Sequence, residues 1–262
     1  MKIVLLVFLL NFAGHLVLAE DFQYSRSCLS TIIPQDGLAY INTPELREIN
    51  QMTGIRIVEL TKPAFDPIEN VTFQPEPNNA EKINFTKKIA AFLKRLPVDF
   101  LLHNKEVCFV IAKRFAIAEA ITLGSVVIIP TDASPMTISH EFLHAVDSLH
   151  LIESNPRAWN DLNRDGGCVY EDDPKARVLK RNFPDIDECF VSPYGGTLLG
   201  EDRAELFSAM MDNYNLLLKD IVSQTTIDYK VANLKNFLRL FSPHMDEAFW
   251  INSAQPHYSW PH

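Results

Sequence analysis

Apolar residues recur every three or four positions in several stretches of this chain, the spacing that places side chains on one face of an α-helix. The pattern predicts helices at residues 46–52, 80–96, 202–222 and 228–241. The second is the clearest, because Pro97 cannot continue a helix and marks its end. In the third, Asn213 lies in register with the apolar positions Leu206, Met210 and Leu217, so we expect it on the same face.

A further helix is predicted to begin after Ser134. Serine is a favoured N-cap residue, and the proline that follows it is favoured in the first turn. His140 and His144 lie at the edge of an apolar face, so we expect both to be partly buried. That face is made by Ile138, Phe142, Ala145, Val146 and Leu149.

Short apolar, β-branched runs between turn residues predict strands at 55–60, 107–112 and 125–129. The last strand leads into the helix that follows Ser134. Together with the predicted helices, these strands indicate an α+β fold.

Other segments are less regular. Residues 20–78 are interrupted by prolines and predict an N-terminal lobe or extension, which a linker-like stretch closes. Residues 151–193 are rich in turn residues and predict an irregular insertion. The chain is therefore divided into a leader (1–19), an N-terminal lobe or extension (20–78) and a main domain (79–262).

The first 19 residues have the composition of a secretory signal peptide. Lys2 precedes an apolar run, and residues 17–19 are suited to cleavage before Glu20. The run is short for a membrane span and is interrupted by Asn11 and His15, which disfavours the alternative of an uncleaved anchor. We therefore expect a secreted or periplasmic protein with no stable membrane anchor.

Export to an oxidising compartment favours disulfides. The chain has 4 cysteines, which allow three pairings. A bond between Cys168 and Cys189 would close a local loop and leave Cys28 to pair with Cys108. A cysteine-based zinc site is disfavoured because the sequence has no C-x-x-C pair.

The chain is acidic, with a net charge of −9 at pH 7. It has no basic stretch with interleaved aromatic residues, which argues against nucleic acid or an anionic membrane as the main partner. We expect a monomer whose partner is a protein or peptide substrate.

The most informative motif is H-E-F-L-H at residues 140–144. Positions four apart on a helix share one face, so His140 and His144 can hold one metal ion from the same side, with Glu141 beside them. This arrangement is typical of zinc hydrolases, in which a carboxylate takes a proton from a zinc-bound water. The alternative is a surface helix with two solvated histidines.

A catalytic zinc ion usually has three protein ligands, and the sequence offers two candidates for the third. Glu201 and Glu205 are four apart, so that one could bind the metal and the other could orient a ligand histidine. His150 matches the spacing of metzincins, but Asp147 stands where metzincins have a glycine that turns the chain. In an unbroken helix His150 would lie about 120° around the axis from His144. Spacing alone leaves both candidates open.

Two blocks of sequence resemble a known family. H-E-F-L-H-A-V-D at 140–147, and S-P-Y-G-G-T at 192–197 with E-D-R-A-E at 201–205, are similar to the anthrax lethal factor-like zinc peptidases, which include secreted Pro-Pro endopeptidases. The resemblance implies a zincin-like catalytic domain with a small mixed sheet, a site helix and a glutamate-bearing second helix. It implies Zn²⁺ held by His140, His144 and Glu201, Glu141 as the base, Tyr194 as a transition-state donor and Glu205 as a supporting acid.

The resulting hypothesis is a secreted zinc metalloendopeptidase of the gluzincin type, which hydrolyses peptide bonds with a zinc-activated water. We expect the strand at 125–129 to line the cleft and to pair with an extended substrate. Two alternatives stay open: a metzincin-type peptidase that uses His150 as its third ligand, and a non-catalytic secreted protein that binds zinc.

Overall fold

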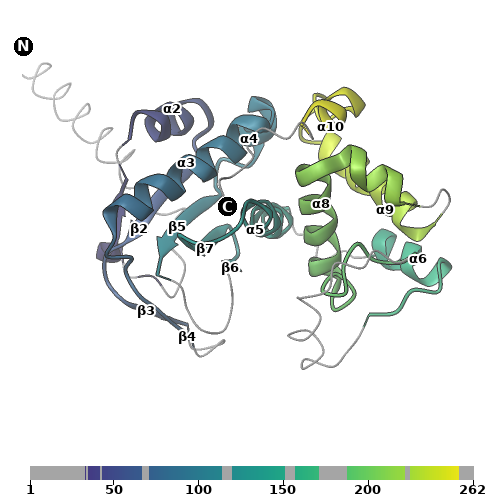
Figure 1. Cartoon of the computed structure of the whole chain (residues 1–262), viewed down its shortest axis with the longest axis horizontal. Helices are drawn as coiled ribbons and strands as arrows, with labels where there is room; N and C mark the ends of the chain where they lie inside the picture. Colours follow the sequence, from purple (N-terminus) through teal and green to yellow (C-terminus); the bar gives the residue numbers. More distant parts are fainter. Residues whose placement is uncertain are drawn as a thin grey trace, which may run out of the picture.

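The computed structural model describes residues 33, 35–41, 43–66, 71–113, 120–150, 157–170, 188–221 and 225–253. The predicted leader at 1–19 and Cys28 lie outside these residues. The described part is a mixed α+β structure with eight helices and a small mixed sheet (Figure 1). The α+β class predicted from the sequence is therefore confirmed.

A five-stranded sheet of order β1-β2-β5-β7-β6 lies in one half of the molecule (Figure 1). Its three central strands are parallel, and each edge strand is antiparallel to its neighbour. β1 and β2 come from the predicted N-terminal lobe or extension, so this segment shares a sheet with the main domain. The strands are β1 (Leu38–Tyr40), β2 (Arg56–Leu60), β5 (Cys108–Ala112), β6 (Ile121–Leu123) and β7 (Val126–Pro130).

The expectation that the strand at 125–129 would pair with an extended substrate is wrong. β7 pairs with β5 on one side and with β6 on the other, so both of its edges are used. Among the described strands, β6 is at the end of the sheet on this side.

Both faces of the sheet are buried, because successive side chains of a strand point to opposite sides. Phe109 and Val127 pack into the core beneath the helices. Val110 and Ile128 pack on the other face, where the hairpin of β3 (Ala64–Asp66) and β4 (Val71–Phe73) contributes Phe73. Continuous burial explains why β5 and β7 are apolar along their whole length.

Figure 1 shows α2, α3 and α4 on the side of the sheet, α6, α8, α9 and α10 on the other side of the molecule, and α5 between them. One hydrophobic core joins the two halves, with Phe142 of α5 and Phe207 of α8 among its members. The helices are α2 (Pro44–Thr53), α3 (Asn79–Arg95), α4 (Val98–His103), α5 (Pro135–Leu149), α6 (Arg157–Asp165), α8 (Leu199–Asp220), α9 (Thr226–Arg239) and α10 (Glu247–Ser253). Among these helices, none has the length and apolar content needed to cross a bilayer.

Local sequence explains where the best-predicted helices begin. The Asn78 side chain accepts hydrogen bonds from the first turn of α3, and Ser134 accepts one from the backbone N–H of Thr137 in α5 at 3.0 Å. Each cap satisfies backbone donors that the helix itself leaves without a partner. α3 ends at Arg95 with Leu96 as its C-cap, just before Pro97, so the proline marks the end of the helix as the sequence predicts.

Two sequence expectations are corrected. The segment 151–193 was predicted to be an irregular insertion, but it contains the helix α6. Because Trp159 of α6 is buried, tertiary packing stabilises a helix that the turn-rich local sequence does not favour. Asn213 does not continue the regular face of α8. It adopts non-helical backbone angles, and its side chain accepts a hydrogen bond from the N–H of Leu216 at 3.0 Å, which marks a kink.

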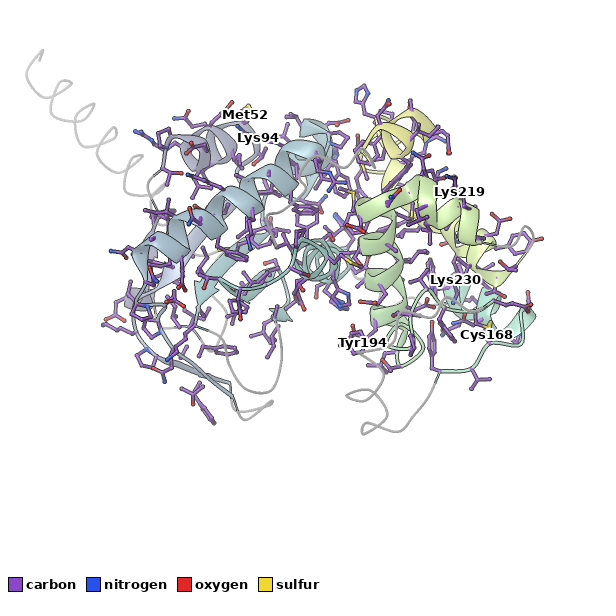
Figure 2. The ribbon with its side chains drawn as sticks, viewed as in Figure 1. Met52, Lys94, Cys168, Tyr194, Lys219 and Lys230 are labelled. Carbon is purple, nitrogen blue, oxygen red and sulfur yellow. A yellow bond between two sulfur atoms is a disulfide. The ribbon has the colours of Figure 1, made fainter. Side chains whose placement is uncertain are left out.

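The predicted disulfide between Cys168 and Cys189 is present, with Cα atoms 5.6 Å apart. Lys230 of α9 lies in the same region (Figure 2) and donates a hydrogen bond to the carbonyl of Cys189 at 2.7 Å. The second predicted pair involves Cys28, which lies outside the described residues. The confirmed bond and Lys230 together fix the start of the segment that leads to α8.

Candidate metal centre

α5 presents the H-E-F-L-H motif because its opposite face is anchored in the core. Phe142 lies against Phe92 and Phe109, with ring centroids 5.3 and 6.2 Å away. Anchoring this side of the helix turns His140 and His144 toward α8, the element with which α5 makes its most extensive contacts among the described residues.

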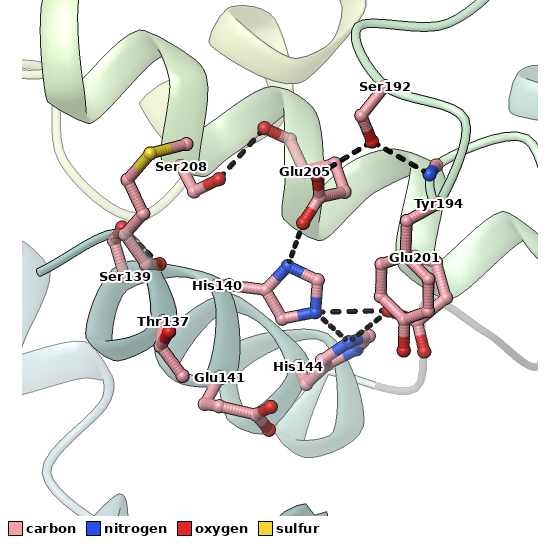
Figure 3. A network of polar contacts seen from close by, with 12 residues as sticks. Thr137, Ser139, His140, Glu141, His144, Ser192, Tyr194, Glu201, Glu205 and Ser208 are labelled. Carbon is pink, nitrogen blue, oxygen red and sulfur yellow. Dashed lines mark hydrogen bonds and ion pairs between the residues drawn. The ribbon is translucent and has the colours of Figure 1, made fainter. Parts of the chain in front are cut away.

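Three side-chain donors converge between α5 and α8 (Figure 3). His140 Nε2 lies 3.0 Å from His144 Nε2 and 3.0 Å from Glu201 Oε2, and His144 Nε2 lies 3.3 Å from the same oxygen. A tetrahedral ion with bonds of about 2.0–2.1 Å places its ligands about 3.3 Å apart. The donor triangle therefore has the dimensions of three ligands of one such ion.

A second carboxylate fixes the orientation of His140. Glu205 Oε1 lies 2.8 Å from His140 Nδ1, so the other ring nitrogen faces Glu201 and His144. Ser192 in turn donates a hydrogen bond to Glu205 Oε2 at 2.7 Å. A carboxylate behind a histidine is the usual support of a metal-binding imidazole, because it holds both the ring and its tautomer.

The ionisation of these groups is coupled. Burial alone would lower the pKa of His140, but its hydrogen bonds with Glu201 and Glu205 outweigh burial and raise it. Burial alone would raise the pKa values of both carboxyl groups, and the hydrogen bonds to the histidines lower them instead. The metal-free site therefore favours a protonated imidazole between two carboxylates, and a cation that binds there must compete with that proton.

Glu141 and Tyr194 lie beside the donor triangle. Figure 3 shows Glu141 on the side of His140 that faces away from Glu205. The ring of Tyr194 is 5.9 Å from that of His140. Glu141, Tyr194 and His140 line an open pocket of about 220 Å³. The other residues of its lining are Ser134, Met136, Thr137, Ser192 and Glu205. A substrate in this pocket would meet a carboxylate and a phenol next to the donor triangle.

The structure does not bring His150 into this group. His150 follows the last turn of α5, and its Nε2 lies 3.1 Å from the amide oxygen of Asn104. Its ring stacks on Phe241 with centroids 4.0 Å apart. The metzincin alternative therefore has no support in the geometry, because the unbroken helix carries His150 away from His144.

Sequence reasoning missed two residues of the site. Thr122 on β6 hydrogen-bonds to Glu141, and Ser192 hydrogen-bonds to Glu205. Ser192 lies within the second resembling block, yet its type alone suggested no role. Nothing in the sequence indicated a role for Thr122, because its contact with Glu141 depends on how the hairpin of β6 and β7 is placed over α5.

No family model, no curated protein and no solved structure matches this chain. The family resemblance of the two motif blocks therefore stays a prediction. The features of this protein that indicate a function are the donor set, its supporting carboxylate and the groups that line the adjacent pocket.

Proposed function

We propose that this protein is a secreted zinc-dependent metalloendopeptidase. The observation that supports the proposal most directly is the convergence of His140, His144 and Glu201 beside a further carboxylate, Glu141. Two histidines and one glutamate form one of the common protein ligand sets of a catalytic zinc site, which keeps one position open.

The donor chemistry fits Zn²⁺ better than the common hard cations. Calcium and magnesium prefer oxygen ligands, whereas two of the three donors here are imidazole nitrogens. Imidazole also suits copper and nickel, but these ions favour square-planar or tetragonal arrangements. The ligand distances described above match a tetrahedral ion.

Each neighbouring group has a task in peptide hydrolysis. When bound, Zn²⁺ supplies a Lewis acid that polarises the scissile carbonyl and lowers the pKa of a water molecule to about 7. Glu141 accepts the proton of the attacking water and passes it to the leaving nitrogen. Tyr194 donates a hydrogen bond to the developing oxyanion. β6, at one edge of the sheet formed by the described strands, pairs with an extended substrate.

Metal analysis of the purified protein tests the ligand set. His144→Ala and Glu201→Ala should each lose zinc, whereas the wild type should hold one ion per chain. Glu106→Ala is a matched control, because it removes an exposed glutamate from a turn. His150→Ala should also keep its zinc. Loss of zinc from His150→Ala, with retention in Glu201→Ala, would replace this ligand set with the metzincin one.

Peptide-library cleavage, read by mass spectrometry, tests the reaction. Glu141→Gln should hold zinc with wild-type stoichiometry and cleave nothing, because the amide cannot accept the proton of the water. Tyr194→Phe should retain zinc and lose on the order of 10²-fold in turnover. A wild-type protein that holds zinc but cleaves no peptide would instead support the non-catalytic alternative.

A further inference from the structure

We propose that Thr122 is a positioning residue that holds the carboxylate of Glu141 for proton transfer. The inference depends on the proposed peptidase function, in which Glu141 is the base. It adds a residue from a different element, because Thr122 lies on β6 whereas Glu141 lies on α5.

The contacts of Thr122 support this role. Its Oγ1 lies 2.6 Å from Glu141 Oε2 and 3.1 Å from the backbone oxygen of the same residue. The hydroxyl has one proton, so it donates to one acceptor at a time. The shorter contact falls in the range of a hydroxyl that donates to a carboxylate. Thr122 therefore holds Glu141 by its side chain and has a second acceptor within reach.

The backbone makes Thr122 a rigid support. β6 and β7 form a tight hairpin with register Thr122↔Val127, and Gly124 adopts φ 61° in the connecting turn. A positive φ at this position suits glycine and matches the twist of a hairpin. Val127 is fully buried in the sheet, so the hairpin cannot slide without exposing its apolar side chains.

The arrangement suits a base that must turn during the reaction. A glutamate side chain has three rotatable bonds, and a single side-chain hydrogen bond restricts them. The backbone oxygen of Glu141 keeps the hydroxyl hydrogen-bonded when the carboxylate turns toward a substrate. Because β6 is an edge strand of the sheet that the described residues form, Thr122 also connects the surface that an extended substrate would use with the base.

Three variants test the proposal. Thr122→Val has nearly the same shape without the hydroxyl, and Thr122→Ser restores the hydroxyl. Thr72→Val is the control, because Thr72 is an exposed strand threonine in the separate sheet of β3 and β4. We expect Thr122→Val to keep its zinc and its KM but to lose about 10- to 100-fold in kcat, the range for a misplaced catalytic group. Thr122→Ser should recover most of this loss.

Crystal structures of the zinc-loaded variants give a second readout that needs no turnover. The wild type and Thr122→Ser should show Glu141 in one conformer, with Oε2 on the hydroxyl, whereas Thr122→Val should show several conformers. A single unchanged conformer in Thr122→Val, or an equal loss of kcat in Thr72→Val, would overturn the role of Thr122. If the wild type cleaves no peptide, the proposed function fails, and the conformers of Glu141 still decide whether Thr122 positions it.

Discussion

Arg203 donates to both carboxylate oxygens of Asp147, from Nε at 2.6 Å and from Nη2 at 3.0 Å, and so ties α8 to α5. The two side chains are 3 % and 1 % exposed. The guanidinium also lies 4.9 Å from the ring of Trp159 and 4.8 Å from that of Phe237. Because Arg203 follows Glu201 by two positions, the pair fixes the distance between α5 and α8, the two helices that carry the donor triangle.

The first prediction concerns this buried pair. Arg203→Met leaves the carboxylate of Asp147 buried without its partner, which typically costs 3–5 kcal/mol of unfolding free energy, so we expect a loss of about 4 kcal/mol. Urea denaturation with a chelator present measures it. The double variant Arg203→Met/Asp147→Leu should recover much of the loss, because no unpaired charge remains. A single variant within about 1 kcal/mol of the wild type would contradict the role of the pair as a fixed link.

The second prediction concerns the support behind His140. Glu205→Ala removes the acceptor at Nδ1 without removing a metal ligand, so zinc affinity should fall by about 10- to 100-fold. Competition with a chromophoric chelator measures the affinity. Ser192→Ala should weaken binding in the same direction and by less, since it acts only through Glu205. Unchanged affinity in Glu205→Ala would show that the carboxylate does not orient the ring.

The third prediction is a pH dependence of the metal-free protein. The pKa of His140 is raised above its ordinary value of 6.5, since its hydrogen bonds with Glu201 and Glu205 outweigh burial. A group with a raised pKa in the folded state adds stability that is fully present below the unfolded value and is lost as pH rises through the folded one. The unfolding free energy of chelator-treated protein should therefore fall as pH rises above about 6.5, compared with its value in mildly acidic buffer.

The urea midpoint of the metal-free protein, measured at pH values from mildly acidic to above about 6.5, tests this loss of stability. His140→Gln should make the midpoint depend less on pH, because the amide cannot take up the proton. Zinc affinity should rise over the same interval, since the ion competes with that proton. A metal-free wild type that gains stability with rising pH would contradict the coupling.

The fourth prediction concerns the disulfide. The Cys168–Cys189 bond spans 21 positions, and the chain-entropy model assigns a loop of this length about 3 kcal/mol of stabilisation. The double variant Cys168→Ala/Cys189→Ala should lose that amount in urea denaturation. It should retain zinc, because the three ligands lie on α5 and α8 outside this loop. Loss of zinc from a folded double variant would show that the loop is needed to place Glu201.

The sequence pattern predicted the helices and strands that are determined by their own local sequence. α3 and α5 begin at side-chain caps that can be identified in the sequence, and β5 and β7 are continuous apolar runs because both of their faces are buried. The motif placed His140 and His144 on one face of α5. Spacing could not choose between Glu201 and His150, because the choice depends on how α8 crosses α5. That crossing is set by tertiary contacts such as Asp147 with Arg203.

The elements that were missed depend on packing between distant segments. α6 is polar for most of its length, and its buried Trp159 donates a hydrogen bond to Asp202 at 2.8 Å. β6 has three residues, too few for a periodic pattern. Thr122 therefore acquires its contact with Glu141 only when the hairpin is folded over the helix.

The first turn of α8 gives three consecutive side chains three different sets of partners. Glu201 faces the imidazoles, Asp202 is bound by Trp159 and Lys230, and Arg203 reaches α5. A one-residue insertion before this turn would rotate all three by about 100° and break every one of these connections together. A redesign of the site for another ion can therefore replace the Glu201 side chain. It must keep the rotation of α8 about its own axis unchanged.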